Sequence, residues 1–344
     1  MTSDYDLDWF HPLSEYRVER IECDLSVSGI YDELVHVPVL WNGDVYTVDT
    51  PSLFSSEREE AKQCKLLKYS TSSKSWSKVL IPCETSRDHV HTHVLTTYHS
   101  KLLLIGDVHK VLEFDASKST FKESTNIEPL PSGTGEVVSA ASEGDNLLVI
   151  CNDGNKDWTS VNIFDGKHWK VHDGPYLHQG SKLQVFIHNC KVFLAEWFHR
   201  STVNIYKTSL QSLYCDEPHV WQVLKSTLPR PHRVTSNFIS LGNHLCMVSY
   251  DHRGGGDNIR VWYYSVNYEG WLELGNVDIH DLQDFPSHIQ IVGLPDGTLI
   301  TMSSMFKHHQ LHLKLKPEGK TMVLCMIGQL DILLTVHVLH IHTY

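Results

Sequence analysis

The 344-residue sequence predicts an all-β fold built from repeated antiparallel sheets, and three observations lead to this prediction. A degenerate sequence repeat of about fifty residues recurs from residue 35 to residue 325, which is typical of repeat architectures. Each repeat begins with two short apolar runs joined by a tight turn and continues into a spaced pair of large apolar or aromatic residues. No stretch shows a sustained period of 3.6 residues, so little helix is expected.

The first hairpin of each repeat is marked by a two-residue turn between runs rich in Val, Ile and Leu. Asn-Gly and Asp-Gly are strong hairpin signals because both central positions take positive φ. Runs that are apolar on both faces suit inner strands packed between neighbouring sheets. In chain order, the turns are expected at Asn42-Gly43, His99-Ser100, Gly144-Asp145, His188-Asn189, Gly242-Asn243 and Asp296-Gly297.

The third and fourth strands of a repeat are indicated by two aromatic residues that lie seven positions apart in the sequence, with turn-forming residues between them. The spacing is weaker at Leu315 and Met322, is five at Phe164 and Trp169, and is interrupted by an insertion between Tyr206 and Trp221. The clear pairs are Tyr69 with Trp76, Phe114 with Phe121 and Tyr264 with Trp271. Six repeats of four short strands, arranged radially, predict a six-bladed β-propeller of four-stranded antiparallel blades.

The order of strand, turn, strand, Gly and spaced aromatics resembles the kelch repeat over residues 35–325. The diglycine of that repeat is reduced here to Gly106, and its His near the first strand corresponds to His36, His93 and His288. The resemblance implies a scaffold or adaptor that recognises partner proteins through one face of the ring. It also implies an alternative, because some propellers of similar type are copper oxidases resembling galactose oxidase and others are glycoside hydrolases.

Three segments are expected along the chain. Residues 1–34 form an N-terminal extension that packs on the ring or closes it, residues 35–325 form the propeller, and residues 326–344 form an irregular C-terminal tail. Two segments could supply the outer strand of the last blade, either residues 15–24 or residues 323–328. Closure matters because an unpaired sheet edge invites aggregation, and local closure with residues 1–34 packing on the outside is expected.

The composition indicates which classes of partner and which cellular compartment are expected. The net charge of −12 and the lack of a basic stripe disfavour nucleic acid, whose binding needs clustered Lys and Arg. The eight cysteines include no C-x-x-C, there is no N-x-S/T sequon, and the first residues lack the features of a signal peptide, so a cytoplasmic setting is expected. Residues 322–339 approach the length of a membrane span, but the central Asp331 disfavours one.

The expected contact surface is the face that carries the loops between the second and third strands. Trp, Tyr and Arg anchor interfaces because they bury a large area and keep a polar group. The alternative is that these aromatic side chains plug the tops of the blades. The candidate partner-binding residues are Trp158, Trp197, Phe198, Arg200, Tyr250, His252, Arg253 and Phe306.

No cofactor, metal or catalytic residue is predicted. His89, His91 and His93 alternate and would share one face of a strand, but no carboxylate or thiolate is spaced to complete a zinc site. The sequence therefore predicts a non-catalytic protein interaction module that binds a peptide or loop, with a propeller enzyme as the alternative.

Overall fold

The structure is a computed structural model, and it describes nineteen stretches of the chain. These stretches are residues 15–22, 37–49, 65–73, 75–80, 93–106, 110–152, 158–178, 181–198, 202–215, 220–224, 235–241, 244–251, 258–265, 270–278, 289–293, 299–303, 312–316, 322–330 and 333–342.

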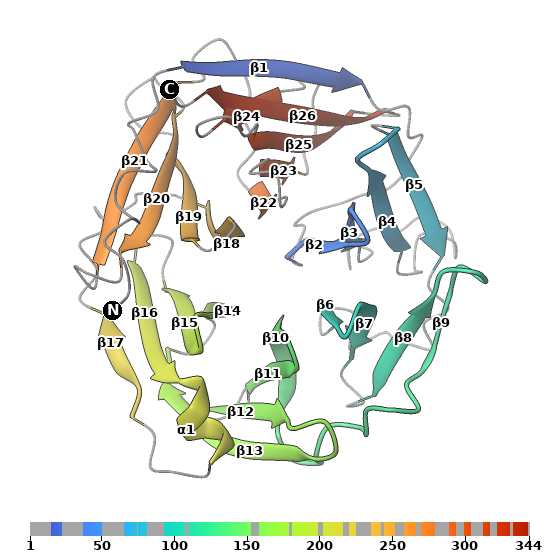
Figure 1. Ribbon diagram of the computed structural model, residues 1–344, viewed down its shortest axis with the longest axis vertical. Coiled ribbons are helices and arrows are strands. Elements are labelled where there is room, and N and C mark those ends of the chain that lie inside the picture. The colour runs from blue at the N-terminus through green and yellow to red at the C-terminus, as the bar shows by residue number, and fades with distance from the viewer. Residues whose placement is uncertain are drawn as a thin grey trace, which may run out of the picture.

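Small antiparallel sheets stand side by side in chain order around a common centre (Figure 1). The first sheet consists of β2 (Val39–Trp41), β3 (Asp44–Asp49), β4 (Lys65–Ser70) and β5 (Ser75–Leu80). The second consists of β6 (Val94–Tyr98), β7 (Lys101–Ile105), β8 (Val111–Asp115) and β9 (Thr120–Glu123). The third consists of β10 (Glu136–Glu143), β11 (Asn146–Asn152), β12 (Trp158–Phe164) and β13 (Trp169–Tyr176).

The ring continues through two further four-stranded sheets. The fourth sheet consists of β14 (Lys182–His188), β15 (Lys191–Phe198), β16 (Thr202–Ser209) and β17 (Gln222–Leu224). The fifth consists of β18 (Thr235–Leu241), β19 (His244–Asp251), β20 (Asn258–Ser265) and β21 (Gly270–Asp278). The predicted all-β propeller of four-stranded antiparallel sheets is therefore confirmed at this level.

The last sheet departs from the prediction. It contains six strands, which are β1 (Glu15–Glu22), β22 (Ile289–Gly293), β23 (Leu299–Ser303), β24 (His312–Lys316), β25 (Met322–Leu330) and β26 (Leu333–His342). β1 pairs with β26 from Glu15↔His342 to Glu22↔Thr335, so both ends of the chain enter one sheet. The predicted count of six four-stranded blades is thus wrong, because β26 is inserted between β25 and β23 and β1 is added at the edge beside β24.

Residues 333–342, expected as part of an irregular tail, form β26. The sequence LLTVHVLHIH is rich in Leu, Val and Ile with Thr and His between them, a composition that suits a strand. The segment expected to be a poor membrane span is likewise divided between β25 and β26. Among the residues described, no helix is long and apolar enough to cross a membrane.

The tight turns that the structure describes lie where the sequence predicts them, with one shift. Asn42 and Gly43 have φ of 50° and 81°, and His99 and Ser100 have φ of 46° and 59°. In the fourth sheet the turn is at Asn189 and Cys190 rather than one residue earlier, since His188 pairs with Lys191. The turns predicted at Gly242-Asn243 and Asp296-Gly297 lie outside the described residues.

The spaced aromatic residues are cross-strand partners. Tyr69 pairs with Trp76, Phe114 with Phe121, Phe164 with Trp169 and Tyr264 with Trp271. The ring centroids of Phe114 and Phe121 lie 5.1 Å apart, and those of Tyr264 and Trp271 lie 5.5 Å apart. Such pairs each contribute about 0.2–1 kcal/mol to a sheet, so the seven-residue spacing in the sequence is the signature of the outer hairpin.

Aliphatic side chains join neighbouring sheets from the first to the fifth. The cluster between the third and fourth sheets contains Leu148, Ile150, Val161, Ile163, Val185, Val192, Leu194 and Tyr206. Comparable clusters join the first sheet to the second, the second to the third and the fourth to the fifth. Full burial of one such side chain contributes about 1.5–3 kcal/mol, so these interfaces are the main source of stability in the described ring.

The insertion in the fourth repeat contains a short helix, α1 (Leu210–Tyr214), whose N-cap is Ser209. Leu210 and Leu213 are buried against the cluster between the third and fourth sheets. The Tyr214 hydroxyl donates to the carbonyl of Phe164 over 3.2 Å. The helix therefore ties the outer part of the fourth sheet to the third.

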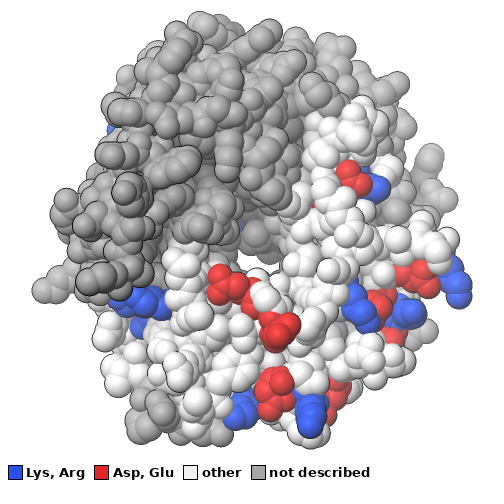
Figure 2. Space-filling model, in the orientation of Figure 1, with Lys and Arg blue, Asp and Glu red and all other residues white. Residues whose placement is uncertain are grey.

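Charged side chains of both signs are interspersed on the face shown in Figure 2 among the residues described there. Ion pairs between neighbouring strands include Lys68 with Asp44 and Lys101 with Glu113, each 2.8 Å long. Exposed pairs of this kind contribute about 0–1 kcal/mol. They adjust the surface charge more than they hold the ring together.

Candidate binding face and the Glu196 network

The face predicted to bind a partner lies at one end of the strands in each sheet. Since neighbouring strands are antiparallel, the loop between the second and third strands lies at the same end as the crossing to the next sheet. In the fourth sheet, this end holds the end of β15, the start of β16 and the crossing at residues 177–181 that leads from β13 into β14. This is the part of the face that the structure describes in most detail.

The predicted contact residues are placed unevenly. Trp158 begins β12, Phe198 ends β15 and Tyr250 lies in β19, so their backbones are at the expected end of the strands, while their side chains fall outside the description. Arg200, His252, Arg253 and Phe306 lie outside the described residues. Trp197 is thus the predicted contact residue whose side chain can be examined.

The side chain of Trp197 packs between two sheets. Its ring lies 5.6 Å from that of Phe238 on β18, and it borders the cluster between the fourth and fifth sheets. Its Nε1–H is buried and has no hydrogen-bond partner in the described part of the structure. Trp197 therefore contributes to the packing between the fourth and fifth sheets.

Glu196 precedes Trp197 and points to the opposite side of β15, toward the third sheet. Successive side chains of a strand alternate in this way. Glu196 has 0% of its surface exposed. A buried carboxylate is costly unless it is hydrogen-bonded, so its partners identify its role.

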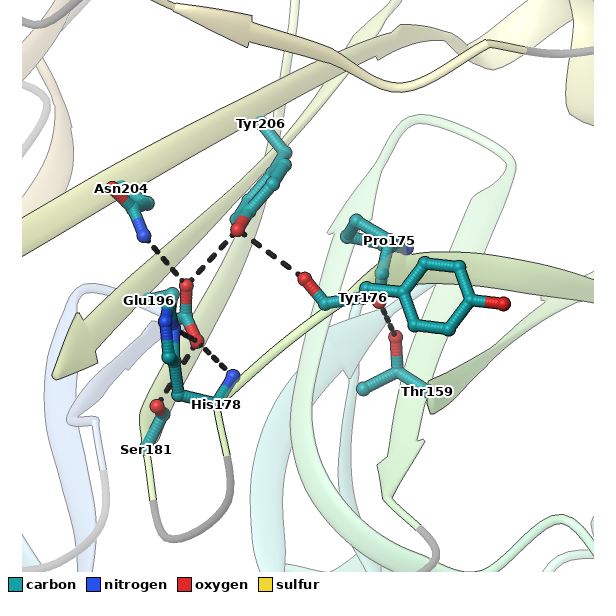
Figure 3. A network of polar contacts seen from close by, with 8 residues as sticks. All are labelled: Thr159, Pro175, Tyr176, His178, Ser181, Glu196, Asn204 and Tyr206. Atoms are coloured by element: carbon teal, nitrogen blue, oxygen red, sulfur yellow. Dashed lines mark hydrogen bonds and ion pairs between the residues drawn. The ribbon is translucent and has the colours of Figure 1, made fainter. Parts of the chain in front are cut away.

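Three donors from the crossing reach one oxygen of Glu196 (Figure 3). Glu196 Oε1 accepts the backbone N–H of His178, the Nδ1–H of the same histidine over 3.0 Å, and the hydroxyl of Ser181 over 3.0 Å. The side chain of His178 is 51% exposed, so its ring joins the buried carboxylate to the surface of the face.

Two donors from β16 reach the other oxygen. Glu196 Oε2 accepts Asn204 Nδ2 over 2.9 Å and the Tyr206 hydroxyl over 3.0 Å. The Tyr206 hydroxyl also lies 3.3 Å from the carbonyl of Tyr176, the last residue of β13. One carboxylate therefore links the crossing, the second strand and the third strand of the fourth sheet.

The electrostatics of this network follow from its donors. Burial alone would raise the pKa of Glu196, but the hydrogen bonds from Asn204, His178 and Tyr206 outweigh it, and the pKa lies below its usual value. Burial and the adjacent carboxylate raise the pKa of Tyr206 to about 12. Glu196 is therefore an anion and Tyr206 a neutral donor near neutral pH.

Glu196, His178, Ser181 and Asn204 do not belong to the contact residues predicted from the sequence. One signal was available, because Glu196 is the only charged residue within the apolar run VFLAEWF. The partners of such a charge could not be found by spacing, since His178 and Ser181 precede it by 18 and 15 residues across a sheet junction.

The described residues contain no group of three or more His, Cys, Asp and Glu side chains suited to a metal ion. Of the alternating histidines, His93 is described and is buried at the start of the second sheet, while His89 and His91 lie outside the described residues.

The ring of small antiparallel sheets defines the class of protein as a β-propeller, and solved structures agree at the level of fold. The chain is similar to an α-L-arabinanase of Penicillium chrysogenum solved with arabinobiose, with a TM-score of 0.51 and 12% identity over 94% of this chain and 99% of that one. It is similar to a sialidase of Trypanosoma rangeli solved with a difluorinated ligand, with a TM-score of 0.50 and 11% identity over 95% of this chain and 59% of that one. A further similar structure is the Dos1 propeller, with a TM-score of 0.44 and 12% identity over 80% of this chain and 69% of that one.

These similarities extend to the fold alone, because the identities are low. No protein-family model matches the chain, and no curated protein sequence matches it.

Proposed function

We propose that this chain is a non-catalytic interaction module, and that the face carrying the loops between second and third strands binds a peptide or loop of a partner protein. We further propose that the propeller is a degenerate kelch-type ring of six units, the last enlarged by terminal strands, and that it works in the cytoplasm. The eight predicted contact residues remain the proposed contact set.

One observation carries this proposal. Of the acidic side chains described at this end of the sheets, Glu136 at the start of β10 is exposed, whereas Glu196 is buried and both of its oxygens are occupied by donors from the protein. A general acid or base has to reach the proton that it transfers. A fully buried carboxylate that accepts five hydrogen bonds is better suited to holding the backbone of a recognition surface, where preorganisation favours binding.

The test uses matched variants on the two ends of the strands. Arg200→Ala combined with Arg253→Ala removes two proposed anchors, and Lys118→Ala combined with Lys122→Ala is the control at the opposite end, in and beside the β8–β9 turn. The immobilised full chain and both double variants are exposed to native cell lysate, and retained proteins are identified and titrated individually. The expected result is a partner whose affinity falls at least about tenfold in the first variant and is unchanged in the second.

Equal retention by all three proteins would contradict the proposed face. The enzyme alternative is tested in parallel with arabinan and sialoside substrates and by metal analysis of the purified chain. Turnover of either substrate, or stoichiometric copper, would overturn the non-catalytic proposal.

A further inference from the structure

β13 is the outermost strand of the third sheet, and its outer edge pairs with no described strand (Figure 1). It has eight residues, whereas β5, β9 and β17, the outermost strands of the first, second and fourth sheets, have six, four and three. The main-chain N–H and C=O groups of an uncovered edge can pair with a strand of another chain, and a longer edge offers more of them. The contacts along the outer edge of β13 therefore bear on how copies of this chain interact.

Three residues of β13 turn their main-chain groups toward this edge. In an antiparallel pair, residues whose N–H and C=O point to the partner strand alternate with residues whose groups point away from it. The N–H of Trp169 and the C=O of Asp173 point away from β12, because each bonds to a side chain outside the sheet. The register is regular between these two residues, so the N–H and C=O of Val171 also point outward.

Two side chains cover the ends of this row of three residues. Glu128 lies in the crossing from β9 to β10, and its Oε1 accepts the N–H of Trp169 over 3.0 Å. The Glu128 carbonyl also accepts the indole N–H of Trp169 over 2.8 Å. Trp221, one residue before β17, donates its Nε1–H to the carbonyl of Asp173 over 3.3 Å. Glu128 and Trp221 are therefore the edge caps of β13.

The edge is also covered toward the end of the strand. Pro175 has no N–H, and its carbonyl accepts the hydroxyl of Thr159 over 3.3 Å. The carbonyl of Tyr176 lies 3.3 Å from the Tyr206 hydroxyl. Val171, with 48% of its surface exposed, is left between the two edge caps.

We propose that Glu128 and Trp221 prevent the outer edge of β13 from pairing with the same edge of a second copy of this chain. Every copy presents this edge, so two copies could pair antiparallel about a twofold axis through Val171. With both edge caps in place, only Val171 can exchange main-chain hydrogen bonds with the second copy, and one residue pair does not offset the cost of association. Without the edge caps, Trp169 and Asp173 add two further pairs. This protection does not depend on what the proposed binding face recognises.

Packing holds the edge caps in position. Ile127 and Leu130, which flank Glu128, are buried in the cluster between the second and third sheets. The Glu128 side chain is itself 43% exposed and also lies 3.5 Å from the exposed ring of His168, so its truncation leaves the buried packing in place. Trp221 borders the cluster between the third and fourth sheets, so its truncation removes some packing as well as a hydrogen bond.

Sedimentation equilibrium of the purified full chain tests this inference. In Glu128→Ala combined with Trp221→Ala, the average molar mass should approach a doubling relative to the wild type as the protein concentration rises. Adding Val171→Pro to the double variant should restore the wild-type mass, because proline has no N–H and is tolerated on an edge strand. Val171→Pro in the otherwise wild-type chain is the matched control and should leave the mass unchanged.

A double variant that is folded by circular dichroism and keeps the wild-type mass at every concentration would overturn the proposal. Dimers that persist after Val171→Pro, or species larger than twice the wild-type mass, would overturn it as well, because an edge that pairs with itself is used up in the dimer. If the double variant does not fold, Glu128→Ala with and without Val171→Pro carries the same comparison. That single variant uncovers Trp169 beside Val171, and a mass equal to that of the wild type would then count against the edge caps.

Discussion

The ring of His93 lies directly over Gly106, so closely that a Cβ on Gly106 would come 2.8 Å from His93 Nε2. His93 is buried just before β6, and Gly106 is buried just after β7. These strands are paired, with Val94 opposite Ile105. The His before the first strand and the Gly after the second, which are separate sequence features, thus form one contact.

Replacing Gly106 with Ala should therefore destabilise the second sheet. Overpacking of a tight interior contact costs about 1–3 kcal/mol, and the buried ring of His93 has little room to move. Urea unfolding measures the loss. In a double-mutant cycle with His93→Ala, the combined loss should be smaller than the sum of the single losses, and additivity would show that the two residues do not interact.

Glu196→Gln should cost about 3 kcal/mol of unfolding free energy, because an amide leaves at least one buried donor of the network unsatisfied. Asn204→Ala, which removes one donor and keeps the carboxylate, should cost less. Chemical denaturation of the three proteins orders these effects. A Gln variant as stable as the wild type would show that the charge of Glu196 is not needed.

The contribution of Glu196 should also depend on pH. Its pKa in the folded chain lies below the ordinary value of 4.5, so the unfolded chain binds the proton more readily. The stabilisation is therefore fully present above pH 4.5 and is lost as the pH falls through the lower folded value. The stability gap between the wild type and Glu196→Gln, measured from pH 7 downward, should narrow below pH 4.5. A gap that is constant with pH would contradict the assignment.

Trp197→Phe should have little effect on stability or raise it slightly, by up to about 1 kcal/mol. The substitution keeps an aromatic ring against Phe238 and removes a buried N–H that has no acceptor in the described structure. Trp197→Ala is the contrast and should cost about 3 kcal/mol, since it leaves a cavity. Thermal unfolding separates the two, and an equal loss in both variants would show that the indole itself is needed.

The cysteines should differ in reactivity. Cys151 and Cys246 are buried, and burial raises the pKa of their thiols to about 11 and about 12. Cys190 and Cys215 are free and exposed. Alkylation of the native chain followed by peptide mass spectrometry should modify the exposed pair first, and modification of Cys151 before unfolding would contradict the packing of the third sheet.

Local patterns in the sequence determined the repeated hairpins. Tyr69 with Trp76, Phe114 with Phe121 and the turn at Asn42-Gly43 follow from residue spacing, because hairpin partners are close along the chain. The one-residue shift to Asn189 and Cys190 shows the limit of such patterns, since neighbouring polar residues offer similar turns and the packing of flanking strands selects between them.

Only the tertiary structure decided the last sheet and the polar junction. The pairing of β1 with β26 joins residues from opposite ends of the chain, and the Glu196 network joins β15 to a crossing from the preceding sheet. Such contacts arise when sheets close into a ring and bury edges and charges together. Their partners are set by that closure, which no local spacing in the sequence records.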